Sequence, residues 1–568
     1  MTKSRTAAFA LSLMAVAFLG TGFAADPADD AKKAADTAAQ IAALKAQLAA
    51  QQKQIEQLQT ALQSEMKLLD QVAINTAPAT APAAAPSRSA GLGEIASTTP
   101  MLPPAPAVVT PPRLFPPPPP QGATAEVTAP LQLQIGNTTI MPVGFMDATA
   151  YWKDKNAGGS IGSSFGSVPY NNAATSKLSE MRFSPQNSRI GFRVDGNWNG
   201  THFLAYNEFD FLGQSGATNL SVSNGGFVPR LRLFWVDLRK GEWEMLAGQS
   251  WSMLTPNRKG ISALPGDLFY SQVIDVNYMA GLTWTRQPGV RVLFHPSDHV
   301  TWGLSLENPD AYIGGSAGGS GITLPSALGG LAGTQLDNAG NVQTTPNLHP
   351  DIISKLAFDP SSHVHFEIAG IERTFKLWNT TTGQPASGQY STKVGAGGSF
   401  NGNFEIAPNF RLITNNYWSD GGGRYLFGQA PDLVVRSDGS VSPLHSGGTV
   451  DGFEAVVNKN TLLYAYYGGI YIGRDVALDA NGTSLVGYGY HGAANSQNKD
   501  IQEITFGLNQ TIWKDAKYGA LNFMAQYEYL LRAPWYWAAG VAGGKETHDN
   551  TIYLNLRYSL PGGVPSMK

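Results

Sequence analysis

From about residue 140 onward, apolar and polar residues alternate along the chain with a period of two. The clearest stretches are 190–194, 230–235 and 552–558, where Ile, Leu, Phe, Val and Trp share one face and Arg, Asn, Thr, Glu or Gly the other. Alternation of this kind predicts half-buried β-strands. In a soluble sandwich the apolar face would meet a second sheet. In an outer-membrane barrel that face meets lipid, and the polar face lines water.

The connections between these strands favour the barrel. Short polar turns are expected at 197–200, 239–241, 296–299, 360–362, 407–409, 459–460 and 514–517. Between them lie long Gly-, Ser- and Asn-rich segments at 154–180, 213–228, 255–280, 308–349, 377–390, 419–445, 474–499 and 533–548. Strict alternation of tight turns and long loops is typical of bacterial barrels, and it implies about sixteen strands, an even number. We therefore predict that residues 140–568 form an all-β, transmembrane antiparallel barrel.

Large aromatic residues near the expected strand ends agree with a membrane interface, where amphipathic rings are favoured. They are Trp152, Trp198, Trp235, Trp251, Trp418, Trp513, Trp535 and Tyr558. Core aromatics of a soluble β protein could produce the same pattern, so this observation is only supportive.

The first 139 residues follow other patterns. Residues 1–24 read as a signal peptide, with Lys3 and Arg5 before a short apolar stretch and small residues before the expected cleavage after Ala24. Within 26–76, one heptad position carries Ile41, Leu48, Ile55, Leu62 and Leu69, and the other carries Leu44, Gln51, Leu58, Glu65 and Val72. This repeat predicts a periplasmic coiled coil, with a single helix packed on the barrel as the alternative. The proline-rich segment 77–139 predicts an extended linker.

Composition narrows the function classes. A formal net charge of -3 argues against a nucleic-acid partner, and the absence of cysteine removes a disulfide scaffold. After the signal peptide, no apolar run is long enough for a membrane helix. Any membrane span of the exported chain is therefore expected to consist of strands, in the outer membrane of a Gram-negative bacterium.

The order of these segments resembles the DcaP-like outer-membrane porins. The segments that carry the resemblance are 187–192, 208–211, 246–251 and 423–428, together with the coiled coil and linker before the barrel. The resemblance implies a homotrimeric, sixteen-stranded channel that passes small anionic solutes such as dicarboxylates. It supplies no motif that assigns solute-contacting residues.

Candidate solute-contacting residues come instead from the alternation. The inward-facing arginines are expected to be Arg182, Arg189, Arg193, Arg230, Arg232 and Arg291. Guanidinium groups stay charged and can bind a carboxylate through two parallel hydrogen bonds. Alternatively, Arg189 and its neighbours brace the wall through cross-strand ion pairs with Glu208 and Asp210. The direction of Arg286 is left open, because Pro288 implies a nearby bulge.

A constriction is expected in the loop 255–278 after the fifth strand, which by analogy with general porins folds inward. This would bring Arg258, Lys259 and Asp267 near the lumen. A pore discriminates by its narrowest point and by the charge that lines it.

Signals for catalysis are weak. The stretch 314–318 matches a nucleophile elbow but lies in a loop without the flanking strand and helix. His363 and His365 form a possible metal pair without a third ligand. We expect no enzyme, metal or cofactor.

The sequence thus predicts a passive porin with lipid or lipopolysaccharide around it and possible peptidoglycan contact through the coiled coil. The main alternative is a non-conducting envelope tether or adhesin that uses the barrel as an anchor. A barrel hydrolase and a gated transporter are weaker alternatives. A gated transporter would need a plug domain before the barrel, and the segment there is too proline-rich to fold as one.

Overall fold

The computed structural model describes residues 131–561 apart from 158–159, 214–226, 269–271, 316–320, 340–344, 382–383, 494–496, 516 and 538–544. The signal peptide, the coiled coil and most of the proline-rich linker predicted from the sequence lie outside the described residues. None of the described helices is long and apolar enough to cross a membrane.

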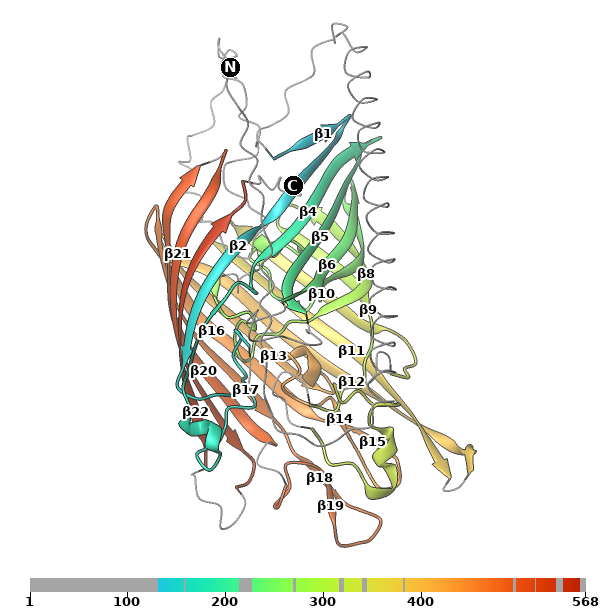
Figure 1. The fold of residues 1–568 in the computed structure, drawn as a ribbon. Coiled ribbons are helices and arrows are strands. Elements are labelled where there is room, and N and C mark those ends of the chain that lie inside the picture. Colours follow the sequence, from blue (N-terminus) through green and yellow to red (C-terminus); the bar gives the residue numbers. More distant parts are fainter. Residues whose placement is uncertain are drawn as a thin grey trace, which may run out of the picture. The chain divides into compact units, whose positions relative to one another are not determined.

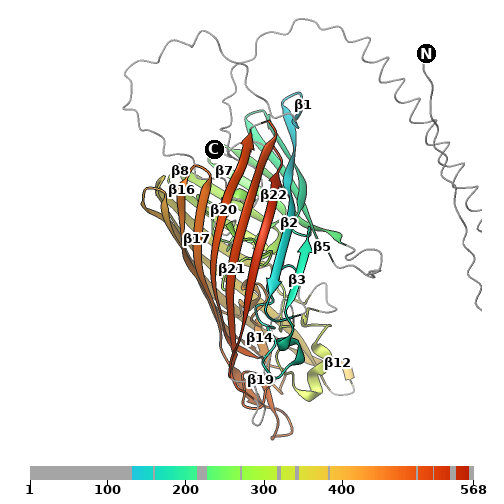
Figure 2. The ribbon, with the colours of Figure 1, turned by 60° about the vertical axis from the view of Figure 1, so that its left-hand side comes forward.

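Sixteen antiparallel strands close into a barrel, as the sequence predicted (Figure 1, Figure 2). The wall consists of β2 (Thr138–Lys153), β3 (Glu180–Ser184) with β4 (Arg189–Trp198), β5 (Thr201–Gly213), β6 (Val228–Lys240), β7 (Trp243–Trp251), β8 (Arg286–Ser297), β9 (Val300–Glu307), β10 (Asp351–Ser361), β11 (Val364–Thr381), β12 (Gln384–Ala407), β13 (Phe410–Asp420), β16 (His445–Asn458), β17 (Thr461–Ile472), β20 (Asn498–Asp515), β21 (Gly519–Pro534) and β22 (Thr547–Ser559). The segments β3 and β4 together make one wall strand, because both pair with β2. The short β1 (Leu133–Ile135) pairs with the start of β2.

The barrel closes where the last strand meets the first. β22 pairs with β2 in an antiparallel register that places Tyr553 opposite Tyr151. With β3 and β4 counted as one, every wall strand in the described part of the chain has two hydrogen-bonded neighbours.

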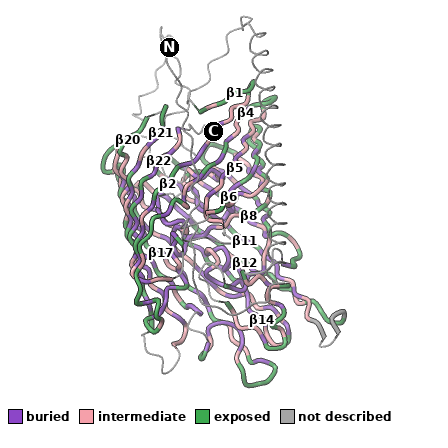
Figure 3. The backbone as a smooth tube through the Cα atoms, viewed as in Figure 1, coloured by how far each residue is buried: buried purple, intermediate pink, exposed green. Residues whose placement is uncertain are grey.

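Buried and exposed residues alternate along the wall strands (Figure 3). On β17, Leu463, Tyr467 and Tyr471 are exposed on the outside, whereas Tyr464 and Tyr466 are buried inside. A closed barrel with apolar residues outside and polar residues inside is suited to lipid. Trp235 and Trp251 are exceptions to the predicted aromatic belt, because both are buried inside the barrel.

The short and long connections segregate to opposite ends of the barrel, here called the turn end and the loop end. At the turn end, Asn199 and Gly200 both have positive φ, of 48° and 77°, which suits a two-residue hairpin turn. The prediction of a loop at 377–390 is wrong, because 377–381 and 384–390 continue β11 and β12 as strand, and this hairpin projects from the wall (Figure 1).

Several loops contain short elements of their own. They are the single-turn helices η1 (Ala174–Lys177), η2 (Pro265–Asp267), η4 (Ser326–Leu331) and η5 (Gly423–Tyr425), and the hairpins β14 (Leu433–Val435)–β15 (Val441–Pro443) and β18 (Asp475–Leu478)–β19 (Leu485–Tyr488). The loops containing η2 and η5 fold into the barrel, where their apolar residues pack against one another and the wall.

Candidate functional site: the lumen and its arginine cluster

The loop between β7 and β8, residues 252–285, crosses the interior of the barrel; we call it the crossing loop. Its backbone N–H groups donate to inward-facing side chains of distant wall strands. The pairs are Met253 to Glu307 (2.8 Å), Asn257 to Glu367 (3.3 Å), Ile274 to Gln526 (2.8 Å), Ala280 to Glu503 (2.8 Å) and Thr283 to Asn415 (3.1 Å). Carboxylates and amides of the wall thus satisfy a loop backbone that is removed from water.

Glycines let the crossing loop lie directly on the wall. A Cβ at Gly468 of β17 would stand 2.1 Å from the carbonyl oxygen of Ala280. A Cβ at Gly281, whose φ is +88°, would stand 2.4 Å from the carbonyl oxygens of Thr449 and Gly469. Any larger residue on either side would separate the loop from the wall.

The three residues predicted for the constriction have different surroundings. Arg258 makes a bidentate pair with Glu454 of β16, at 2.7 and 2.8 Å. Asp267 accepts a hydrogen bond from the Ser262 hydroxyl at 2.6 Å. Lys259 is exposed. The crossing loop thus uses Arg258 to hold the wall, while Lys259 is the cation that solvent reaches.

A second loop, residues 421–444, also folds inward and meets the crossing loop. Trp284 donates its backbone N–H to the carbonyl of Tyr425 at 3.0 Å, and its ring stacks on Phe427 with centroids 4.7 Å apart. Arg424 of this loop bonds Asp351 at 2.9 Å, and Arg373 of β11 bonds Asp432 at 2.8 Å. Sequence reasoning singled out 423–428 as a segment but did not place it in the lumen.

An arginine cluster lines the wall that faces the crossing loop. It comprises Arg189 of β4, Arg230 and Arg232 of β6, and Arg286 of β8, with the carboxylates of Glu208 and Asp210 on β5. Antiparallel pairing and alternation put them on one face, because the register sets Arg189 opposite Asp210 and Asp210 opposite Arg230.

The cluster is joined by short ion pairs. Arg232 reaches Glu208 at 2.7 Å and Asp210 at 2.8 Å. Arg230 makes a bidentate pair with Asp210 at 2.7 and 3.0 Å, and its side chain is 38% exposed. Arg189 stands 3.6 Å from Glu208. The arginines therefore both brace the wall and carry its charge.

Arg286, whose direction the sequence left open, completes the cluster. Its guanidinium lies 5.5 and 5.8 Å from the ring centroids of Trp251 and Trp284, within cation–π range. No carboxylate pairs with it among the residues that the structure describes. A parity argument could not find it, because β8 begins at this residue.

The other predicted arginines lie apart from the cluster. Arg193 pairs with Asp195 at 2.8 Å and is fully buried. Arg182 pairs with Glu180 at 3.2 Å, with a side chain that is 56% exposed. Arg291 is buried on β8.

Two carboxylates that are separate from the arginine cluster meet at Ser163. Glu528 accepts from the Ser163 hydroxyl at 2.7 Å, and Asp275 accepts from the Ser163 backbone N–H at 2.9 Å. Burial raises the pKa of Asp275 despite hydrogen bonds to its carboxylate. Asp275 of the crossing loop and Glu528 of β21 thus share Ser163 as a hydrogen-bond donor.

The histidine pair has local partners at the turn end. His363 lies 3.0 Å from Glu405, and His365 lies 3.0 Å from Asp359. Within the described ranges, no group of three His, Cys, Asp or Glu residues could hold a metal ion.

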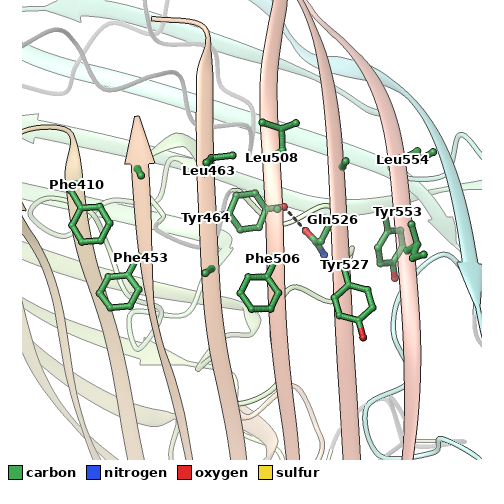
Figure 4. Close-up of a pocket in the computed structure, with 15 residues that line it drawn as sticks. Phe410, Phe453, Leu463, Tyr464, Phe506, Leu508, Gln526, Tyr527, Tyr553 and Leu554 are labelled. Atoms are coloured by element: carbon green, nitrogen blue, oxygen red, sulfur yellow. Dashed lines mark hydrogen bonds between the residues drawn. The ribbon is translucent and has the colours of Figure 1, made fainter. Parts of the chain in front are cut away.

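A hollow of about 690 Å³ lies on the outside of β13, β16, β17, β20, β21 and β22 (Figure 4). Exposed apolar side chains such as Phe453, Phe506 and Tyr527 line it, beside the Tyr464–Gln526 hydrogen bond of 2.6 Å. Its apolar lining suits an acyl chain rather than a small anion.

Comparison with known proteins supports the fold. No family model and no curated protein matches the sequence. The crystal structure of the outer-membrane channel DcaP of Acinetobacter baumannii is similar with a TM-score of 0.53 and 15% identity, over 75% of this chain and 99% of that chain. The anion-selective porin from Comamonas acidovorans (TM-score 0.40, 10% identity, 74% and 100% of the chains) and Salmonella typhi OmpF in complex with daunomycin (0.41, 9%, 75% and 100%) also match. The similarity to DcaP, with its TM-score above 0.5, indicates that the barrel has the fold of an outer-membrane porin.

Proposed function

We propose that this protein is a passive outer-membrane channel for small, preferentially anionic solutes such as dicarboxylates. The observation that carries the proposal is the charge of the arginine cluster. Four guanidinium groups, of Arg189, Arg230, Arg232 and Arg286, stand against two carboxylates, of Glu208 and Asp210. A pore wall with a surplus of fixed positive charge favours anions.

Reversal potentials in a salt gradient test this proposal. Across a planar bilayer with a KCl gradient, the native protein is expected to pass chloride in preference to potassium. Replacing Arg230 and Arg232 together by Ala leaves Glu208 and Asp210 with less positive charge beside them and should move the reversal potential towards cation preference. The control is Lys240→Ala, an exposed residue at the turn end. A native channel that prefers potassium would contradict the anion assignment.

A non-conducting envelope anchor is the second candidate, and the contact between two inward-folded loops favours it. The crossing loop and the loop 421–444 meet inside the barrel through Trp284, Tyr425 and Phe427. An anchor needs no open path, whereas a channel needs one beside these loops. Single-channel recordings separate the two, because an anchor gives no conductance steps.

For assembly we propose a homotrimer in the outer membrane, surrounded by lipid and lipopolysaccharide. A cluster of polar side chains on the outside of the barrel supports contact with a partner subunit at that surface. Asp451 of β16 accepts hydrogen bonds from the hydroxyls of Thr414 (2.6 Å) and Thr449 (2.8 Å), and Thr449 also donates to Asn416 at 3.1 Å. An acidic side chain facing hydrocarbon is unfavourable, so a partner subunit suits this face better than lipid. The periplasmic coiled coil and its contact with peptidoglycan remain predictions from the sequence.

A further inference from the structure

Tyr278 is held by the crossing loop against the arginine cluster. Its hydroxyl accepts hydrogen bonds from Arg232 Nη2 at 2.9 Å and from Arg189 Nη2 at 3.4 Å. The residue is 2% exposed, and its φ of +65° lies in a region that non-glycine residues seldom adopt. A strained backbone therefore delivers one phenolic oxygen to two guanidinium groups.

The Tyr278 ring is held by aromatic contacts, as its hydroxyl is held by hydrogen bonds. Trp251 and Trp284 meet it edge to face, with ring centroids 6.0 and 5.0 Å away. The same two indole rings also contact the Arg286 guanidinium through cation–π interactions. Tyr278 thus occupies an aromatic slot with cations from β4, β6 and β8 at its polar end.

The guanidinium groups around this slot have more N–H donors than the neighbouring acceptors can bind. Among the described residues, Arg189 Nε and Arg286 Nη1 are buried without a hydrogen-bond partner, and Arg189 Nη1 has only the 3.6 Å ion pair with Glu208. Buried donors normally have partners, and charged ones most of all. A tyrosine hydroxyl offers one oxygen, whereas a carboxylate offers two oxygens and a full negative charge.

We propose that the Tyr278 hydroxyl occupies a carboxylate-binding site formed by Arg189, Arg232 and Arg286, and that a permeating carboxylate displaces it. The inference rests on the proposed anion channel and adds the residue that regulates it. A solute reaches the site along Arg230, the partly exposed member of the cluster. Its carboxylate takes the guanidinium donors as the Tyr278 side chain withdraws, and the side chain returns when the solute leaves.

The electrostatics of Tyr278 agree with this role. Burial opposes ionisation of its hydroxyl, but the charges of Arg232, Arg189 and Arg286 outweigh burial and lower its pKa. The acidic neighbours are Glu208 and Asp210, which already pair with Arg232. A site that favours a phenolate over a phenol favours any oxyanion of suitable shape.

Tyr278→Phe tests the inference in planar bilayers, with succinate as the probe. Without the competing hydroxyl, succinate should reduce the chloride current at a concentration on the order of tenfold lower than in the native protein. Arg286→Gln should have the opposite effect, raising that concentration, because it removes one of the three guanidinium charges of the site. The matched control is Tyr464→Phe, since Tyr464 is equally buried but bonds the neutral Gln526.

Alkaline pH gives an independent readout. As pH rises from 7 towards the usual tyrosine pKa of about 10, ionisation of Tyr278 should lower the anion preference of the native channel. Tyr278→Phe should lose that part of the pH dependence, and Tyr464→Phe should keep it. Lysines titrate in the same range, so the difference between the variants is the measured quantity.

The possible outcomes separate the inference from the proposed function. If the native channel prefers anions but Tyr278→Phe matches it in succinate block and pH dependence, the site is not occupied by Tyr278 and the inference is wrong. If the native channel prefers cations or does not conduct, the proposed function itself fails. Folding of each variant is checked by its strand content and by resistance of the barrel to unfolding in detergent.

Discussion

At the scale of single residues, buried ion pairs inside the barrel determine how much a substitution changes stability. At the closing seam, Arg557 of β22 bonds Asp147 of β2 through Nη2 at 2.6 Å and Nε at 3.1 Å, and both side chains are almost completely buried. Asn555 also donates to Asp147, and the Arg557 guanidinium lies 4.0 Å from the Phe145 ring centroid. Removing one member of such a pair leaves an uncompensated charge inside the protein.

Asp147→Asn is therefore expected to destabilise the barrel by about 3–5 kcal/mol. The control is Asp500→Asn, which breaks the solvent-accessible pair with Lys499 and should cost less than about 1 kcal/mol. Thermal unfolding in detergent, followed by loss of strand signal, measures both. Equal midpoints for the two variants would show that the seam pair does not contribute to stability.

Alternation predicted which arginines face inward but not how they are used. It placed Arg189, Arg230 and Arg232 on the face of Glu208 and Asp210, and the structure brings all five together. Arg286 and Tyr278 could not be assigned, since one begins a strand and the other lies in a loop. Their positions depend on contacts between residues that are distant in the sequence.

At the scale of elements, a bulge changes the expected pattern of β6. Arg232 and Leu233 are consecutive and both buried, and the register shifts where Glu208 pairs with Leu233 and Phe209 with Leu231. Simple alternation would put Trp235 outside, in an aromatic belt. The extra residue turns Trp235 inward, where it stacks on Tyr206 with centroids 5.5 Å apart.

The position of the crossing loop depends on the close contact between its Ala280 carbonyl and Gly468 of the wall. Gly468→Ala would place a methyl group against the Ala280 carbonyl and push the loop away from β17. The hydrogen bond from Ala280 to Glu503 would be lost, at a cost of about 1.5–3 kcal/mol to the docked loop. We expect a larger and noisier single-channel conductance with unchanged strand content.

Gly370→Ala is the matched control for this substitution. Gly370 is also a wall glycine, on β11, but the nearest atom to its added Cβ is 3.9 Å away. Its conductance should equal that of the native protein. An unchanged conductance in Gly468→Ala as well would mean that the crossing loop does not limit the pore.

At the scale of the whole molecule, the barrel was predictable and its contents were not. Period-two alternation and the segregation of loops by length follow from lipid outside and water inside, so both can be recognised in the sequence without knowledge of distant contacts. The loop 421–444 has no such period. Its inward fold results from specific contacts, such as Arg424 with Asp351, that link it to distant strands.

The outer face offers a test of assembly. Because the sequence has no cysteine, a single nitroxide label can be attached at Thr449→Cys in the polar group of β13 and β16. If a partner subunit covers this face, the label should be less accessible to oxygen than one at Ile190→Cys, an exposed apolar position on β4. Equal accessibility in outer-membrane vesicles would place both positions in lipid.

The seam between β2 and β22 also constrains when the protein can mature. Asp147 and Arg557 are separated by 410 positions in the chain, so their contact forms only after nearly all of the polypeptide has been exported. Until then the first and last strands present bare backbone edges that can pair with any neighbouring chain. We therefore expect a chaperone to shield these edges before insertion, and we expect the pairing of β2 with β22 to be the last step of barrel closure.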